Sequence, residues 1–359
     1  MTARSHRPSR PGGIAVAVSG ATGLLGEAVC RRLVAADGIR QVVALAPQRP
    51  SVPGVVWRRA DPADPSLASA LSRVDVLVSL ALSTDPDDDR AEQRQFNVRS
   101  AQVALTAAAA TGIGHVVLLS SARVYGANPD NPVPLDEDAQ LRAQPEMSVL
   151  GDLLEIERLV RRSGRAYPQV SAAVLRPALL VGAGLENAAS GLLDGPRMLV
   201  VRGARPHWQF CHVEDLAAAV ETVALCGLTG PITVGSEGFL EQADVEKALG
   251  RRRIELPATV AFGTAARLHA IGVTAGPASE LAFLVHPWVV GSQRLRSAGW
   301  EPSFTNEAAL ADYAAGRPVL QQRLKIGAKG ATAAAGATVA LVGTAALVRR
   351  ARKRRQARS

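Results

Sequence analysis

The stretch VAVSGATGLLGEAVCRRL, residues 16–33, decides the fold of this chain. In it an apolar run ends in a glycine-rich turn, and an amphipathic run follows directly. This order predicts a buried strand, a tight turn and then a helix. The three glycines of the turn, Gly20, Gly23 and Gly26, have the spacing GxxGxxG.

Each glycine has a physical role if the turn binds a dinucleotide. Gly20 permits the tight turn, Gly23 lets the backbone approach a pyrophosphate, and Gly26 lets the helix pack closely on the strand. The backbone N–H groups of Leu24 and Leu25, at the positive end of the helix dipole, then face the phosphates. A turn that serves packing alone is the alternative interpretation of the same residues.

Short apolar runs alternate with longer amphipathic runs through the first half of the chain. The apolar runs lack polar alternation, as do strands that are buried on both faces, and they cover residues 14–20, 41–46, 75–82, 115–121 and 171–182. Helical patterns lie between them, at 24–36, 66–72, 91–110 and 149–163. The alternation predicts an α/β fold with a Rossmann-like, doubly wound parallel sheet.

The chain beyond residue 177 predicts a smaller C-terminal lobe that is interleaved with this core. Strand and helix patterns recur at 209–226 and 230–252, whereas residues 253–305 mix loop, helix and turn signals. We expect one domain over residues 14–322, with its nucleotide-binding core at about 14–177 and 209–227 and its substrate lobe at about 178–208 and 228–310. Residues 1–13 are polar and rich in Pro and Gly, so we expect them to be disordered.

Composition and charge narrow the classes of function. Ten of the 41 Lys and Arg residues lie from Arg323 onward, where there is no acidic residue, so residues 1–322 carry 31 basic and 32 acidic side chains. The main domain is therefore nearly neutral, and we expect no nucleic-acid-binding face on it. The three cysteines have no metal-binding or redox spacing, so we expect buried core thiols and no metal site.

Eight short motifs occur in an order that resembles a known family. They are GATGLLG (20–26), ADPADP (60–65), DVLVSLA (75–81), FNV (96–98), LLSSARVYG (118–126), LRPALLVGAG (175–184), FCHVEDLAAAV (210–220) and GWEP (299–302). As a set they resemble the extended short-chain dehydrogenase/reductase family, the NAD-dependent epimerase/dehydratase group, from about residue 14 to about 310. Within that family the chain is most similar to actinobacterial proteins of the nucleotide-sugar 4-epimerase-like type. The resemblance implies an NAD or NADP cofactor, a sugar-nucleotide or lipid-linked substrate, and a homodimer formed through the helices near 91–110 and 147–163.

The resemblance also implies contacts with the cofactor. Asp61 would bond the adenine amino group, with Pro62 beside it, while Leu80 and Ala81 would border the nicotinamide ribose. Asn97 would support the strand–helix junction near the cofactor. From the residues alone, Asp61 is equally a turn former before a proline, and Asn97 is a helix residue with local hydrogen bonds.

Three further positions take roles from the resemblance. Ser121 matches the serine that bonds the sugar hydroxyl being oxidised, so it is expected either to bind substrate or to be a vestige of a catalytic site. From the residues alone, Ser121 simply ends a strand. His212 and Asp215 belong to a motif that ties the late strand–helix unit to the sheet, and for His212 a structural role is favoured over a catalytic one.

Two positions depart from the NAD-binding pattern. After the second strand, where such enzymes place an acid for the ribose 2′-hydroxyl, the chain has ALAPQRP at 44–50. Arg49 in this loop would pair with a 2′-phosphate and so favour NADP, or it is an exposed loop arginine. Leu82 stands where the family commonly has a small residue against the cofactor.

The expected catalytic pair is missing. Family members that transfer hydride use a Tyr and a Lys four residues apart on one helix, where the Lys lowers the pKa of the Tyr. None of the three tyrosines is followed by Lys at that spacing, and aligning Glu157 with the usual helix acid puts Val149 and Leu153 at the two positions. The acids of this helix, Asp152, Glu155 and Glu157, are either substitute bases or partners of nearby arginines.

A cofactor site without its proton carriers leaves two classes of function. The first is a non-catalytic or atypical NAD(P)-binding protein that senses or scaffolds, and it is favoured by the residues. The second is an NAD(P)-dependent epimerase, dehydratase or reductase with a substituted acid/base.

The C-terminal segment has a different composition. Residues 330–348 are uncharged and made of Ala, Gly, Thr, Val and Leu, and RRARKRRQARS follows them. The stretch has the length of a membrane span, and the basic cluster would attract anionic headgroups. We expect a cytoplasmic domain whose residues 330–359 associate with the membrane surface. The alternative is a disordered linker with a basic end.

Removing this segment tests the membrane interpretation. We expect the intact chain to sediment partly with membranes in cell fractionation, and a chain truncated at Arg323 to stay in the supernatant. High salt should release part of the bound protein, because it screens attraction to headgroups. An intact chain found wholly in the supernatant would favour the disordered linker.

Overall fold

A seven-stranded parallel sheet forms the centre of the molecule. The computed structural model describes residues 12–85, 88–185, 190–193, 197–271 and 276–316. The strand order is β11-β6-β5-β4-β1-β2-β3, with β1 (Ile14–Ser19), β2 (Ile39–Ala46), β3 (Val56–Arg59), β4 (Val76–Ser79), β5 (His115–Leu119), β6 (Ser171–Pro177) and β11 (Gly230–Val234). This confirms the predicted α/β doubly wound fold.

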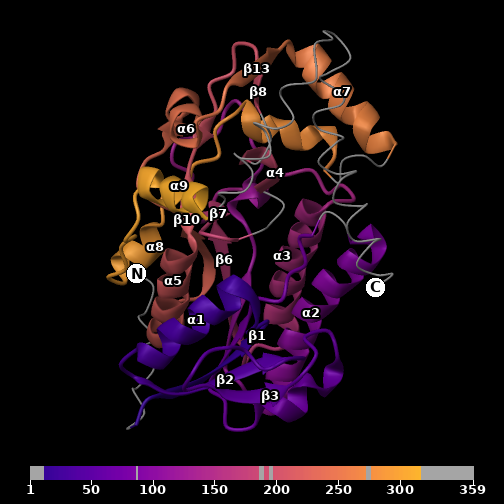
Figure 1. Cartoon of the computed structure of the whole chain (residues 1–359). Coiled ribbons are helices and arrows are strands. Elements are labelled where there is room, and N and C mark those ends of the chain that lie inside the picture. The colour runs from indigo at the N-terminus through magenta and orange to yellow at the C-terminus, as the bar shows by residue number, and fades with distance from the viewer. Residues whose placement is uncertain (1–11, 86–87, 186–189, 194–196, 272–275, 317–359) are drawn as a thin grey trace, which may run out of the picture.

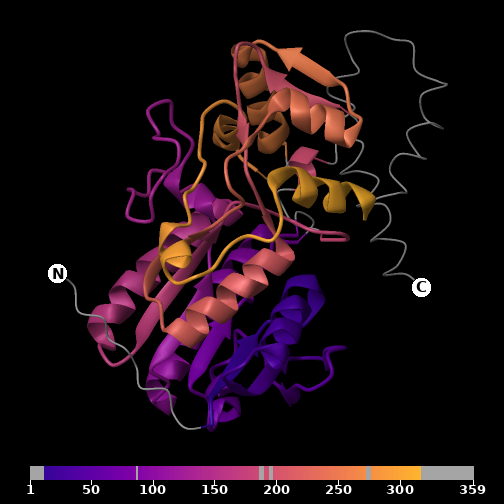
Figure 2. The same cartoon turned by 90° about the vertical axis from the view of Figure 1, so that its left-hand side faces the viewer.

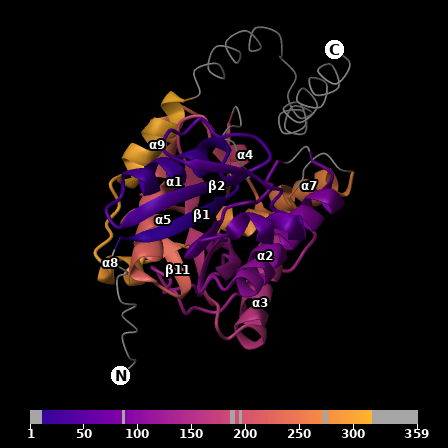
Figure 3. The same ribbon diagram turned by 90° about the horizontal axis from the view of Figure 1, so that it is seen from below.

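Helices cover both faces of the sheet. α1 (Gly23–Ala35) and α5 (Val213–Cys226) pack together on one face, and α2 (Arg90–Thr111) and α3 (Val149–Ala166) pack together on the other (Figures 1 and 3). Short 3-10 helices η1 (Pro65–Leu71) and η2 (Ala122–Tyr125) follow β3 and β5. Because both faces are covered, the strand interiors are buried, which accounts for their continuous apolar runs.

A second lobe lies beyond one end of the sheet (Figure 2). It contains two short strand pairs, β8 (Met198–Val201) with β13 (Arg253–Leu256) and β9 (His207–Trp208) with β12 (Leu240–Glu241). Its helices are α4 (Ser190–Leu193), α6 (Gln242–Leu249), α7 (Ala258–Ala270) and η3 (Ala278–Leu284). The pair β7 (Leu179–Val181) and β10 (Phe210–His212) leads from the sheet toward this lobe, and α8 (Gln293–Ser297) and α9 (Asn306–Ala315) end the described chain.

Two strand predictions need correction. The predicted strand 171–182 is divided after Pro177, because Pro177 has no N–H and the next two N–H groups donate to Val234 O and Gln209 O, at 2.8 and 3.2 Å. The edge strand β3 was not predicted. Val56 and Trp57 in it are exposed, so its sequence lacks the buried run by which the other strands are found.

Two further expectations differ from the structure. Residues 230–234 were expected in the substrate lobe, but they form β11 and pair with β6 at the edge of the main sheet. Cys30 and Cys211 are buried as expected, whereas Cys226 is exposed at the end of α5. Burial raises the pKa of the Cys30 thiol to about 12, which leaves it unreactive at neutral pH.

The predicted tail lies outside the described residues. Residues 1–11 and 317–359 are not described, so the structure leaves the predictions for the N-terminus and for 330–359 untested. No helix in the described ranges combines the length and hydropathy needed to cross a membrane.

A buried ion pair fixes α3 to the sheet. Glu157 of α3 accepts two hydrogen bonds of 2.8 Å from the guanidinium of Arg176 in β6, and a third of 3.0 Å from Ser120 Oγ after β5. Arg176 also donates to Tyr125 Oη at 2.7 Å, and Tyr125 Oη donates to Glu137 O at 2.9 Å. Every member is satisfied, so the network holds one helix, two strand ends and a loop in a single arrangement.

Removing the cation of this pair should be costly. In Arg176→Met, Glu157 stays buried without its partner, and we expect a loss of about 3–5 kcal/mol in the free energy of unfolding. The matched control Arg162→Met removes an exposed arginine of α3 and should change stability by less than about 1 kcal/mol. Urea unfolding measures both, and equal stability of the two variants would contradict a structural role for the pair.

Candidate functional site

The glycine turn lies at the switch point of the sheet. From β1 the chain runs outward through β2 and β3, and it returns to the other side of β1 as β4. In doubly wound sheets, ligands bind beyond the carboxyl ends of the strands at this point. The turn between β1 and α1 occupies that position (Figure 1).

The three glycines have the geometry that a phosphate cradle requires. Gly20 has φ +80°, and a Cβ there would lie 2.9 Å from Ala81 N. A Cβ on Gly26 would lie 2.2 Å from Gly20 O, so only glycine lets α1 pack this closely on the turn. Gly23 has φ +77°, and apart from its chain neighbours and the backbone of α1 no described atom lies within 4 Å of its Cβ position, so this face of the turn is open among the described residues.

The N-terminus of α1 is free to bind an anion. Thr22 precedes the helix but its side chain makes no capping hydrogen bond, and there is no acid in the first turn. The N–H groups of this turn therefore keep the positive end of the helix dipole uncompensated. Leu24 is exposed and Leu25 half-buried, and Leu24 faces the Gly184 loop, with its Cδ1 3.6 Å from the position of a Cβ on Gly184.

The residues expected at the nicotinamide ribose border this turn. Leu80 N donates to Ser19 O at 2.9 Å, and Ala81 is in contact distance of Gly20. Ser19 Oγ is buried beside them with no hydrogen-bond partner among the described residues. Leu82 is only partly buried and packs on the core, so it lines the same end of the sheet without filling it.

The adenine end of the predicted site is less specific. Asp61 Oδ1 accepts from Ala63 N at 2.9 Å, which is the turn-forming role weighed above, while Asp61 remains exposed and Pro62 is buried. Arg49 is exposed in the loop after β2. The roles of Asp61 and Arg49 toward a nucleotide stay predictions.

Asn97 ties the β4–α2 loop to α3. Its amide accepts from Ser83 N at 2.7 Å and donates to Ser83 O and Asp152 Oδ2, both at 3.0 Å. Asp152 is fully buried and forms ion pairs with Arg90 and Arg94 of α2. Asn97 therefore joins the loop after β4 to α3, its role toward a cofactor stays a prediction, and Asp152 is engaged by two cations.

The positions of the expected proton carriers are apolar. Val149 is the first residue of α3 and Leu153, one turn later, is 4% exposed. Ser121 caps η2, where its Oγ accepts from Arg123 N at 3.3 Å. Within the described turn 149–153 of α3, the titratable side chain is Asp152, which pairs with Arg90 and Arg94.

The remaining acids of α3 are paired as well. Glu155 points away from the core and bonds Arg158 and Arg162. Partial burial raises the pKa of Glu155, but the two arginines outweigh it and leave that pKa below its usual value. Glu157 is held by Arg176. The arginine-partner interpretation of all three acids is the one the contacts support.

Tyr125 is no substitute for the missing tyrosine. Its hydroxyl is enclosed between Arg176 and Glu137 O, and burial raises its pKa to about 12 although Arg176 lowers it in part. A phenol with this pKa stays protonated at neutral pH and makes a poor base. Sequence reasoning missed this network, although a charged Arg176 inside a buried apolar strand was its signal.

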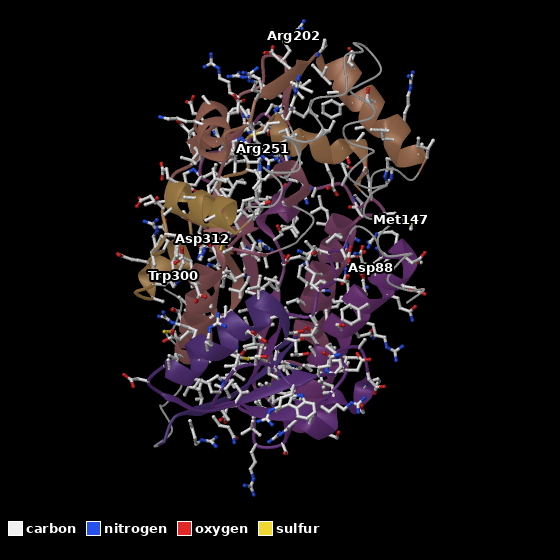
Figure 4. The ribbon with its side chains drawn as sticks, in the orientation of Figure 1. Asp88, Met147, Arg202, Arg251, Trp300 and Asp312 are labelled. Carbon is white, nitrogen blue, oxygen red and sulfur yellow. The ribbon has the colours of Figure 1, made fainter. Side chains whose placement is uncertain are left out.

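His212 and Asp215 have structural roles. His212 caps α5 through Nδ1, bonds Asp312 of α9 through Nε2 at 3.0 Å, and stacks on Phe304 with ring centroids 3.6 Å apart. Buried Asp215 accepts from the N–H groups of Ser303 and Phe304 at 2.7 and 3.2 Å. Figure 4 shows Asp312 and Trp300 on this side of the molecule, by α9 and α8.

Comparison with known proteins places the chain in a family. The sequence model of the NAD dependent epimerase/dehydratase family matches residues 16–230. The chain belongs to this family. An uncharacterized protein of Mycobacterium tuberculosis (strain ATCC 25618 / H37Rv) is 28% identical over 314 residues, which are 84% of each chain.

Solved structures share the fold at low identity. A UDP-glucose 4-epimerase of Thermus thermophilus, in complex with NAD, superposes with a TM-score of 0.64 at 18% identity over 85% of this chain and 100% of that one. A dTDP-glucose 4,6-dehydratase of Bacillus anthracis, also in complex with NAD, gives a TM-score of 0.63 at 14% identity over 87% of this chain and 100% of that one. The family match over residues 16–230 confirms the predicted resemblance, and the two superpositions confirm the fold.

A bulky side chain at Gly23 should abolish dinucleotide binding. In Gly23→Val the isopropyl group would occupy the open face of the turn, where the pyrophosphate is expected. Gly227→Val is the matched control, because Gly227 also has positive φ and open space but caps α5 far from the turn. Asp61→Ala should weaken binding without abolishing it.

Calorimetric titration with NAD and with NADP measures these variants. Wild type and Gly227→Val should bind with similar affinity, and Gly23→Val should show no heat of binding. Equal affinity in wild type and Gly23→Val would contradict the placement of the phosphates.

Proposed function

We propose that this family member binds NAD or NADP and does not carry out the conventional hydride transfer of an epimerase or dehydrogenase. The observation that carries the proposal is that Val149 and Leu153, two apolar residues at the start of α3, stand where proton carriers are expected. The open glycine turn and the uncapped N-terminus of α1 support retained binding. NAD is proposed because the two solved enzymes with this fold were determined in complex with NAD. NADP is the alternative for this chain because Arg49 could pair with a 2′-phosphate.

The effect of losing the proton carriers on the reaction rate can be estimated. A positioned general base contributes roughly 10²–10⁴ to the rate, and the missing lysine also removes a cation from the cofactor site. Asp152, Glu155 and Glu157 are each held by arginine, so none is free to take the proton. On this account Ser121 binds a ligand hydroxyl without a partner to activate it.

A bound dinucleotide without turnover fits a sensing or scaffold role. Such a protein would respond to the occupancy or redox state of its ligand through a conformational difference between its bound and free states. The homodimer through α2 and α3 and membrane association through residues 330–359 stay predictions.

Turnover assays test the proposal directly. We expect no product from UDP-glucose or UDP-galactose with NAD or NADP, and no change in cofactor absorbance, for wild type and for Ser121→Ala alike. A related 4-epimerase assayed under the same conditions serves as the positive control. Robust wild-type turnover that falls steeply in Ser121→Ala would overturn the proposal and indicate a substitute base near Ser121.

A further inference from the structure

A cavity of about 270 Å³ lies between the core and the lobe, apart from the glycine turn. The loop 126–148 and the first turn of α3 line one side of it, and α7 and η3 of the lobe line the other. Its walls include Leu150, Phe262 and Phe283, with Asn128, Arg142 and Glu146 among them. Figure 4 shows Met147, the neighbour of Glu146, on the same side of the molecule as α7.

The cations at this cavity are already neutralised. Arg142 Nη1 bonds Asp130 Oδ2 at 2.7 Å. Arg123 bonds Glu280 at 2.6 Å, and its guanidinium lies 4.6 Å from the centroid of the Phe283 ring. Among the described residues around the cavity, no positive charge is left over to hold a diphosphate, so the cavity is unsuited to the phosphates of a sugar nucleotide.

One polar group on the wall remains incompletely bonded. The Glu146 carboxylate accepts one hydrogen bond, from Ser279 Oγ to Oε2 at 2.8 Å, and its other oxygen has no partner among the described residues. Glu146, Phe262 and Phe283 line the same small space, so a hydrogen-bond acceptor lies beside aromatic rings there.

We propose that this cavity binds a small primary amine with an apolar body. The ammonium would donate to Glu146 Oε1. The body would pack against Phe262, Phe283 and Leu150, where aromatic faces also attract a cation. The volume is just below the usual range of roughly 300–1,000 Å³ for ligand pockets, which limits the ligand to a small molecule.

This site goes beyond the proposed function, because it adds a second ligand next to the first turn of α3. Leu150 and Ser148 line the cavity and flank Val149. The site stands on its own contacts, so it is testable without any dinucleotide present.

Three probes with one phenyl body separate the possible head groups. They are 2-amino-1-phenylethanol, the neutral 1-phenylethane-1,2-diol and the anionic mandelate, titrated calorimetrically into the full-length chain. We expect the amine to bind at least about tenfold more tightly than the diol, because a charge-assisted hydrogen bond is worth that much. Mandelate should not bind, since its carboxylate would face Glu146.

Substitutions test which side chains cause the preference for the amine over the diol. Glu146→Gln should bring the amine and the diol to the same affinity, whereas Glu155→Gln, on the arginine-paired outer side of α3, should leave the preference intact. Phe262→Ala should weaken the amine and the diol alike. Thermal melting confirms that each variant is folded.

Four results would overturn the proposal. They are no binding of the amine to wild type at millimolar concentration, equal affinity for amine and diol, tighter binding of mandelate, or an unchanged preference in folded Glu146→Gln.

Discussion

The ion pair between Glu157 and Arg176 is the constraint on which the site depends. It joins α3 to β6, and Ser120 Oγ adds the end of β5 to the same carboxylate. Because the pair is buried and fully hydrogen-bonded, it fixes both the rotation of α3 about its axis and the position of α3 along the sheet. That arrangement places the start of α3, with Val149 and Leu153 one turn apart, next to the sheet. Neither of these two side chains is titratable. The same pair thus fixes where the first turn of α3 lies relative to the sheet.

The two ends of the candidate site differ in what they present to a ligand. At the glycine turn, close contacts at Gly20 and Gly26 and the open face of Gly23 preserve the shape of a phosphate cradle. At α3, the acids are each neutralised by arginine, and Asp152 is drawn into a cluster with Asn97, Arg90 and Arg94 that joins α2 to α3. Each carboxylate at α3 has its cation: Glu155 pairs within α3, and Glu157 joins α3 to β6.

The sequence predicted the parts of the fold that depend on local pattern. Buried runs such as 115–121 read directly as central strands, and the glycine turn was placed correctly between β1 and α1. Prediction from the sequence failed for β11, because its partner β6 lies more than fifty residues away in the chain. It also failed for β3, because this exposed edge strand has no apolar run. The network of Arg176 with Tyr125 and Glu157, and the cavity between loop 126–148 and the lobe, likewise need three-dimensional neighbours that no spacing reveals.

The central claim is that the chain binds a dinucleotide and does not convert a sugar nucleotide. The purified chain would be incubated overnight with NAD or NADP and UDP-glucose; native mass spectrometry would then weigh the complex, and chromatography would separate UDP-glucose from its 4-epimer and from keto sugars. The account predicts one dinucleotide for each chain and unchanged UDP-glucose. A chain that carries no dinucleotide, or conversion of UDP-glucose to another sugar nucleotide, would contradict it.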